Sequence, residues 1–168
     1  DGNLVVADGK GINFSAWGNT GGTGTDNKHE TLMAYEQGTF TPRLKPNDSE
    51  TGMVSGVGVY VRVGHIVHMR FSFTNKDTTG LPDGKTIAID RLPFICDWDG
   101  QSGYDTTTNL MMQRINTRPQ ATFYTNDNTS ILYGIYASDG GQWAGWQSND
   151  FNNHASTYLN FRMSMLCD

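Results

Sequence analysis

Apolar and polar residues alternate strictly along two consecutive stretches of this chain, between residues 57 and 73. The apolar positions are Val57, Val59, Val61 and Val63 in the first stretch, and Val67, Met69, Phe71 and Phe73 in the second. Alternation with a period of two is typical of a β-strand that is buried on one face. Gly64 and His65 lie between the two stretches as a turn. The pattern therefore predicts a β-hairpin with the apolar positions of both strands buried.

Shorter candidate strands follow this hairpin, over residues 86–89, 110–115, 121–124 and 131–137. Segments rich in Asn, Asp, Gly and Thr separate them, with turn signals about every 8–12 residues, as in sandwiches and jelly rolls. A regular alternation over residues 158–165 closes the chain. It predicts a strand that is central in its sheet, because edge strands are usually irregular or charged. We expect an all-β fold of roughly eight to ten strands, a jelly-roll-like antiparallel β-sandwich.

The first 28 residues do not continue this pattern. Two short apolar groups, Leu4-Val5-Val6-Ala7 and Ile12-Asn13-Phe14, are joined by turn-forming residues. Neither group is long enough to bury itself in a monomer, and cyclic oligomers cover such patches with symmetry-related copies. We expect an extended stalk or linker segment over residues 1–28, followed by a sandwich domain over residues 29–168. The predicted contacts between chains are Leu4, Val6, Ile12 and Phe14.

The domain begins with a segment of mixed character. His29–Tyr35 is compatible with one helical turn. The stretch 35–42 then predicts a short strand with one buried aromatic residue, Phe40. We expect Gly38 to permit a backbone turn that a β-carbon would hinder. Pro42 lacks a backbone donor, so it ends the strand or confines it to a sheet edge.

Four short segments in this order resemble motifs of a known family. They are Gly9-Lys10-Gly11-Ile12-Asn13-Phe14-Ser15-Ala16, Tyr35-Glu36-Gln37-Gly38-Thr39-Phe40-Thr41-Pro42, Tyr60-Val61-Arg62-Val63-Gly64-His65-Ile66-Val67 and Leu92-Pro93-Phe94. Together they resemble the C-terminal modules of bacteriophage tail fibres and tailspikes. Asn13 and Gln37 depart from the Asp and Glu of the family pattern. The resemblance implies a homotrimer with the apolar stalk groups near its threefold axis, located in the virion at the tail-fibre tip and assembled in the host cytoplasm.

Composition limits the partners of the chain. The formal net charge is −5, and Lys and Arg do not cluster in the sequence, which argues against nucleic acid. No apolar run is long enough to cross a bilayer and no signal peptide is recognisable, so we expect no membrane insertion. Whether Cys96 and Cys167 pair is left open by the sequence. Because the chain starts at Asp1 without Met, we expect it to be a fragment of a longer protein.

Two tracts combine aromatic rings with polar side chains. The candidate ligand-binding residues are Trp98, Asp99 and Tyr104 in one tract, and Trp143, Trp146 and Asn149 in the other. Sugars present flat C–H faces and a rim of hydroxyls, so a sugar site combines an aromatic platform with Asn, Asp and Gln partners. We expect these residues to bind host cell-surface polysaccharide or lipopolysaccharide. Alternatively, the rings close an end of the sandwich or lie at a subunit contact, where Trp and Tyr are also enriched.

No motif for metal binding or catalysis accompanies these tracts. His65 and His68 point to opposite faces of a strand and cannot bind one ion together. The acidic loop 97–105 does not match a calcium-binding loop. Glycosidases need two carboxyl groups across a cleft, and the Gln101-Ser102-Gly103 segment lacks the setting of a nucleophile elbow. We therefore expect no metal, no cofactor and no enzymatic activity.

The hypothesis that these observations favour is the receptor-binding tip of a phage tail fibre, which attaches the virion to host-surface glycan. Three weak sites on one trimer would engage a repetitive surface by avidity. A protein receptor is an alternative ligand. Two alternative functions are a structural cap that registers the three chains and a non-catalytic accessory domain of a polysaccharide depolymerase.

Overall fold

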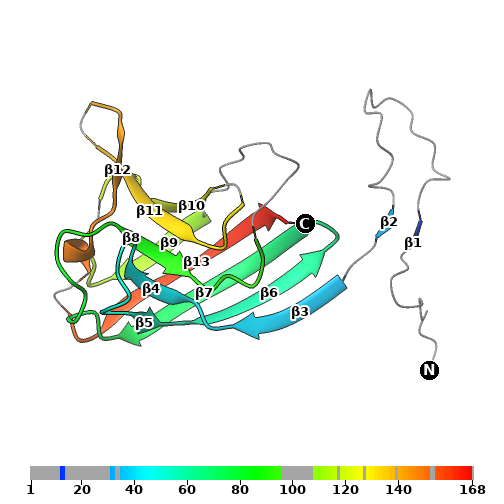
Figure 1. Cartoon of the computed structure of the whole chain (residues 1–168), viewed down its shortest axis with the longest axis horizontal. Coiled ribbons are helices and arrows are strands. Elements are labelled where there is room, and N and C mark those ends of the chain that lie inside the picture. Colours follow the sequence, from blue (N-terminus) through cyan, green and yellow to red (C-terminus); the bar gives the residue numbers. More distant parts are fainter. Residues whose placement is uncertain are drawn as a thin grey trace.

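A computed structural model of the chain describes residues 12–13, 31–32, 35–95, 108–116, 118–126, 128–138, 140–151 and 154–167. For residues 12–13, 31–32 and 108–109 it describes the backbone only. The described residues form an all-β fold of antiparallel strands without an α-helix (Figure 1). None of the described segments is a helix that is long and apolar enough to span a membrane.

One sheet has five strands in the order β3-β6-β7-β13-β9. Their bounds are Tyr35–Phe40 for β3, Val57–Val63 for β6, Ile66–Lys76 for β7, Thr108–Gln113 for β9 and Thr157–Leu166 for β13. The predicted hairpin is confirmed as β6 and β7, which pair from Val57↔Ser72 to Val63↔Ile66 across the turn Gly64-His65. The C-terminal strand β13 lies between β7 and β9, so its predicted central place is also confirmed.

The other sheet has six strands, with the order β10-β11-β8-β4-β5 and with β12 paired to β11. Their bounds are Arg43–Pro46 for β4, Val54–Ser55 for β5, Ile87–Asp90 for β8, Thr122–Thr125 for β10, Leu132–Ala137 for β11 and Trp143–Gly145 for β12. A short 3₁₀ helix, η3 (Ser148–Asp150), follows β12. Strands β8, β9, β10 and β11 match the predicted strands within a few residues, whereas β4, β5 and β12 were not predicted.

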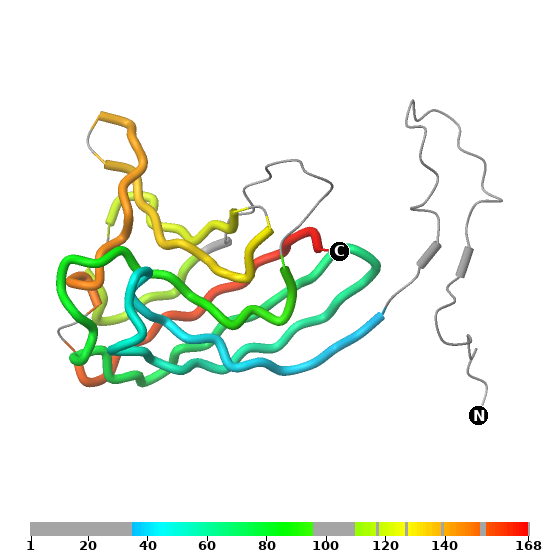
Figure 2. The backbone as a smooth tube through the Cα atoms, viewed as in Figure 1, coloured from blue at the N-terminus to red at the C-terminus, as the bar shows by residue number. Residues whose placement is uncertain are grey.

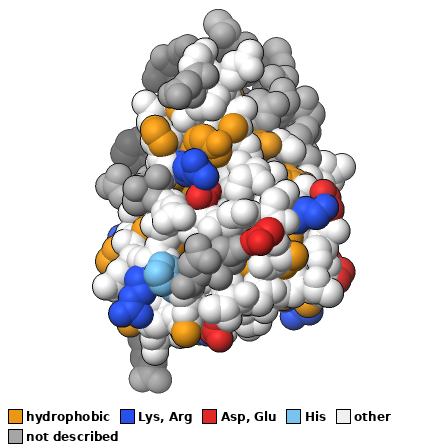
Figure 3. Space-filling model, turned by 90° about the vertical axis from the view of Figure 1, so that its left-hand side faces the viewer, with side chains coloured by type: hydrophobic (Ala, Val, Ile, Leu, Met, Phe, Trp, Pro, Cys, Tyr) orange, Lys and Arg blue, Asp and Glu red, His pale blue; other side chains and the backbone are white. Residues whose placement is uncertain are grey.

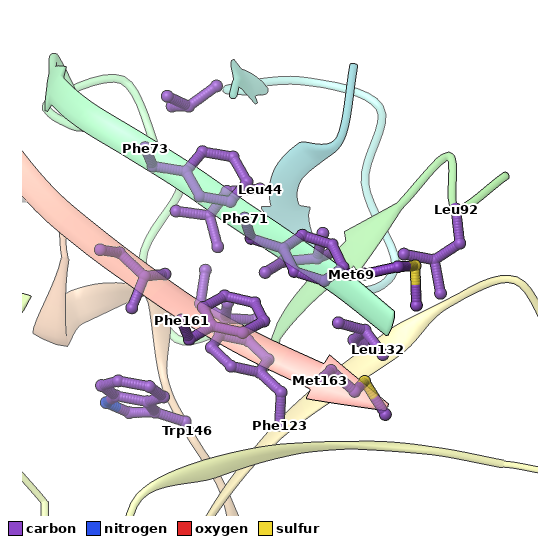
Figure 4. Close-up of a cluster of buried hydrophobic side chains, with 14 of the residues drawn as sticks. Leu44, Met69, Phe71, Phe73, Leu92, Phe123, Leu132, Trp146, Phe161 and Met163 are labelled. Carbon is purple, nitrogen blue, oxygen red and sulfur yellow. The ribbon is translucent and has the colours of Figure 1, made fainter. Parts of the chain in front are cut away.

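The core lies between the two sheets and is organised around stacked phenylalanine rings (Figure 4). Phe71 of β7 stacks on Phe161 of β13 with ring centroids 4.5 Å apart. Phe161 in turn stacks on Phe123 of β10, 5.2 Å away, so the stack passes from one sheet to the other. β7 and β13 run side by side (Figure 2), and the inward side chains of both strands are buried. This continuous apolar layer holds the two sheets together as one support for the loops.

The predicted buried face of β6 is wrong. Its valines point to solvent, with Val57 exposed at 60%, Val59 at 44% and Val63 at 38%. The two-residue turn is the reason, because it sets the register that pairs Val63 with Ile66 and therefore Tyr60 with Met69. Paired residues share a face, and the face of Met69 is buried. A shift of one residue would be needed to bury both apolar sets together, and the turn does not permit it.

Gly38 is required for close packing and not for the expected turn. It lies within β3 opposite Tyr60, and a β-carbon there would be 2.7 Å from atoms of the Tyr60 ring. The relation is reciprocal two residues further along, where Gly58 of β6 pairs with Phe40 and an added β-carbon would be 2.3 Å from the Phe40 ring. Each aromatic ring thus covers the glycine of the opposite strand. Phe40, predicted as buried, is half-buried and packs edge-on against Phe71.

The helical turn expected over His29–Tyr35 is wrong as well. Thr31–Leu32 forms the short strand β2, which pairs with β1 (Ile12–Asn13), and β3 begins at Tyr35. Pairing between β1 and β2 satisfies the backbone N–H and C=O groups of these residues. Apolar spacing over a single turn could not distinguish a helix from a strand. The predicted inter-chain contacts at Leu4, Val6 and Phe14, and the side chain of Ile12, lie outside the described residues. The stalk and its contacts stay predictions.

Candidate ligand-binding surfaces

Trp143 stands on a hairpin that projects from the six-stranded sheet (Figure 1). Its side chain is exposed at 65%, and it pairs with Ala137 where β11 and β12 begin to diverge. Ser138 closes the loop, because its backbone N–H and its hydroxyl both donate to the carbonyl oxygen of Gln142, at 2.9 and 2.7 Å. Gly141 donates back to the Ser138 carbonyl at 3.1 Å. Trp143 is therefore an exposed indole ring on a hydrogen-bonded support.

Two tyrosines extend the outward face on which Trp143 lies. Residues 133, 135 and 137 of β11 point the same way, since side chains alternate along a strand. Tyr133 pairs with Tyr124 of β10, and their ring centroids are 5.7 Å apart. Both tyrosines are half-buried. The outer face of this sheet thus presents a tyrosine pair at one end of β11 and Trp143 at the other.

An ion pair secures the base of the hairpin. Arg118 donates two hydrogen bonds to the Asp150 carboxylate, at 2.9 and 2.8 Å, and its guanidinium lies 5.3 Å from the ring centroid of Tyr136 in β11. The hydrogen bond to Asp150 raises the pKa of Arg118. Ala137 also donates to the carbonyl of Pro119 at 3.1 Å. Figure 3 views the molecule from the left-hand side of Figure 1 and shows hydrophobic side chains beside acidic and basic ones. Because Arg118 and Asp150 already satisfy one another, their main role is to hold the hairpin.

Trp146 is a core residue and not the ligand contact that we expected. Its side chain is 0% exposed and packs against Phe151, with ring centroids 4.7 Å apart, and against Phe123 at 5.6 Å. Its indole nitrogen has no hydrogen-bond partner among the described residues. β12 is only three residues long, and beyond it the chain turns inward so that Trp146 closes the core near η3. This placement corresponds to the alternative in which a tryptophan closes one end of the fold.

The remaining candidates divide into one that the structure describes and three that it does not. Asn149 is exposed in η3, and its side-chain oxygen accepts a 2.5 Å hydrogen bond from the backbone N–H of Gly84. It therefore ties two loops together. Trp98, Asp99 and Tyr104 lie outside the described residues, so their role in binding stays a prediction.

Several titratable residues that the structure describes form structural pairs. Arg43 donates two hydrogen bonds to Asp90, at 2.9 and 2.5 Å, across β4 and β8. Lys45 donates to Glu50 at 2.5 Å, and this bond lowers the pKa of Glu50. Tyr60 donates to Glu36 at 2.6 Å, which raises the pKa of Tyr60. Each of these groups serves to fasten a strand or loop.

His65 in the hairpin turn and His68 in β7 make separate contacts. His65 exchanges contacts with Cys167, including a 2.8 Å backbone hydrogen bond from Cys167 to the His65 carbonyl. His68 contacts the Ser164 hydroxyl through Nδ1 at 2.7 Å. Within the described part of the chain, no three His, Cys, Asp or Glu side chains gather as a metal site would require. Cys167 is buried, and Cys96 lies outside the described residues.

Comparison of the chain with protein-family models, with curated proteins and with solved structures found no match.

Proposed function

We propose that this chain is the receptor-binding tip of a bacteriophage tail fibre, in which a jelly-roll-like sandwich follows an N-terminal stalk segment and three chains assemble into a homotrimer. The motifs between residues 9 and 94 support the assignment to fibres. The observation that carries receptor binding is Trp143, a largely exposed tryptophan on a projecting hairpin. Tryptophan is enriched among the residues that contribute most to binding at interaction sites.

The ligand in this proposal is a glycan of the host surface. The Trp143 ring supplies a flat apolar face for the C–H face of a sugar, and neighbouring loop carbonyls and amides supply hydrogen-bond partners. The tyrosine pair Tyr124 and Tyr133 extends the same face. A single site of this kind binds weakly, and three linked copies raise the apparent affinity on a repetitive surface.

The experiment that tests this proposal measures adsorption of the labelled chain to a panel of bacteria. Trp143→Ala should keep the oligomeric state by light scattering and reduce adsorption about tenfold, the effect of losing one aromatic hot spot. Met53→Ala is the control, because Met53 is another exposed apolar side chain, at 39%, in the loop between β4 and β5 and outside the surfaces described here. Equal adsorption of Trp143→Ala and the parent chain would exclude Trp143 as the contact.

A second function, the structural cap, is favoured by one observation. The outward side chains of one row across β3, β6 and β7 are all apolar: Tyr35, Val63 and Ile66. Val57 and Val59 add to this apolar surface along β6. A surface of this kind is typical of subunit contacts. A chain that forms trimers and adsorbs to no bacterium in the panel would support the cap in place of the receptor-binding tip.

A further inference from the structure

The outer face of the five-stranded sheet places two arginines directly opposite one another. Arg70 of β7 pairs with Arg162 of β13, and both side chains are exposed. Side chains of directly opposite residues begin about 4.5–5.5 Å apart, and like charges in such pairs destabilise a sheet. The guanidinium of Arg70 has no hydrogen bond or ion pair with any residue that the structure describes. Arg162 has a contact of its own within the chain, so Arg70 is the member of the pair whose charge the described fold leaves unmatched.

The same face concentrates positive charge on an acidic chain. Its described outward positions contain Arg70 and Arg162 but neither Asp nor Glu. The chain as a whole has a net charge of −5. A negatively charged ligand would therefore be attracted to this face and repelled by much of the remaining surface.

A groove of about 620 Å³ lies on one side of the arginines. Its side-chain lining includes Arg70, Ser72, Thr74, Met111, Asn160 and Arg162. The Ser72 and Thr74 hydroxyls are 3.0 Å apart, and Thr74 donates to the Asn160 side-chain oxygen at 3.3 Å. This chain of contacts orients the hydroxyls and leaves the Asn160 amide nitrogen as a donor. Met111, exposed at 60%, provides an apolar wall.

A second groove of about 370 Å³ lies on the other side, and the two grooves share Arg70 and Arg162. Its lining includes Val59, Val61, His68 and Ser164. Because Nδ1 of His68 contacts Ser164, Nε2 is the ring nitrogen left for a ligand. Both volumes fall in the range of small-molecule sites, about 300–1,000 Å³.

We propose that Arg70 and Arg162 form a binding site for an anionic glycan. A carboxylate or phosphate on a sugar is held between the two guanidinium groups, whose planar donors match both anions in bidentate geometry. The sugar hydroxyls bond to Ser72, Thr74 and Asn160, and an apolar C–H face lies against Met111. The anion places a negative charge beside Arg70, which has no partner of its own among the described residues. This site is separate from the Trp143 hairpin and shares with the proposed function only the ligand class, a glycan.

The experiment measures binding of the full chain to three immobilised polysaccharides at low and high salt. Polygalacturonate carries carboxylates, phosphomannan carries phosphates and dextran is neutral. We expect retention on one or both acidic polymers, no retention on dextran, and loss in high salt because exposed charges are screened. Retention on only one acidic polymer identifies the anion. Arg70→Gln and Arg162→Gln should each weaken binding about tenfold or more, since each removes a charged hydrogen-bond donor.

Arg91→Gln is the matched control, because it removes the same charge from an exposed arginine elsewhere, after β8. Equal retention of Arg70→Gln and the parent chain, or equal retention on dextran and the acidic polymers, would overturn the inference. So would a failure to bind either acidic polymer. Adsorption to bacteria separates this result from the proposed function. A chain that adsorbs to cells through Trp143 while Arg70→Gln has no effect refutes the anionic site alone, whereas Arg70-dependent binding to acidic polymer without cell adsorption refutes the receptor-binding tip alone.

Discussion

Substitution of Trp143 and of Trp146 by alanine should have opposite consequences, although the two residues are only three positions apart. Trp146 is completely buried against Phe151 and Phe123, whereas Trp143 is largely exposed. Truncation of a buried Trp to Ala costs about 3–5 kcal/mol of unfolding free energy, through lost burial and the cavity left behind. Truncation of an exposed ring usually changes stability by less than about 0.5 kcal/mol. The expected difference between Trp146→Ala and Trp143→Ala is therefore about 3 kcal/mol or more.

The buried indole nitrogen of Trp146 leads to a second prediction about the same residue. It is buried without a hydrogen-bond partner in the described structure, and such a group costs about 1–3 kcal/mol. Trp146→Phe removes this N–H and keeps an aromatic ring between Phe123 and Phe151. Removal of the unsatisfied N–H offsets part of the free energy lost through the smaller side chain. Trp146→Phe should therefore be at least about 2 kcal/mol more stable than Trp146→Ala.

Urea unfolding followed by far-ultraviolet circular dichroism measures these differences without relying on tryptophan emission. All variants are compared at one chain concentration, because oligomerisation makes stability concentration-dependent. The reasoning is refuted if Trp146→Ala unfolds within about 1 kcal/mol of Trp143→Ala, a gap too small for loss of a buried Trp. It is also refuted if Trp146→Phe is as unstable as Trp146→Ala.

Two further predictions concern the packing between β3 and β6 and the ion pair of β4 with the loop after it. Gly58→Ala should destabilise the chain by about 1–3 kcal/mol, because the new β-carbon would lie 2.3 Å from the Phe40 ring. In a Phe40→Ala background the same change should cost much less, and a double-mutant cycle with no coupling would contradict the packing. The bond from Lys45 lowers the pKa of Glu50, so its contribution is present above the ordinary value of 4.5 and is lost as pH falls through the lowered pKa. The difference in melting temperature between the parent chain and Glu50→Gln should therefore be greatest near neutral pH and shrink in acid, and a difference that grows in acid would contradict this assignment.

Alternation in the sequence predicted the fold class and most strands, because buried strands such as β7 and β13 must repeat every second residue. It could not predict β4, where Arg43 is paired with Asp90 of β8, 47 positions away, and Lys45 with Glu50 in the loop after β4. In the sequence alone, a strand whose charge is neutralised by a residue as distant as Asp90 has the pattern of a solvated loop. The buried face of β6 was misassigned for a related reason, since the turn register and not local hydropathy decides which face is covered.

The candidate sites show the same limit. Two tryptophans in one polar tract gave no local signal that Trp143 would be exposed and Trp146 buried, because packing against Phe123 and Phe151 arises only in the folded chain. The arginine pair was visible as outward positions on two predicted strands. Its significance depends on the pairing of β7 with β13, which brings together residues 92 positions apart in sequence, from 70 to 162. No local motif encodes that pairing.

The measurement that tests the central proposal most directly is binding of the purified chain to bacteria, with surface polysaccharide extracted from the same cells as competitor. Light scattering on the same sample gives the oligomeric state. The proposal predicts a trimer that adsorbs to at least one bacterium in the panel and is displaced by that bacterium's polysaccharide and not by dextran. A trimer that adsorbs to no cell, or adsorption that no extracted polysaccharide displaces, would contradict a glycan-binding tip.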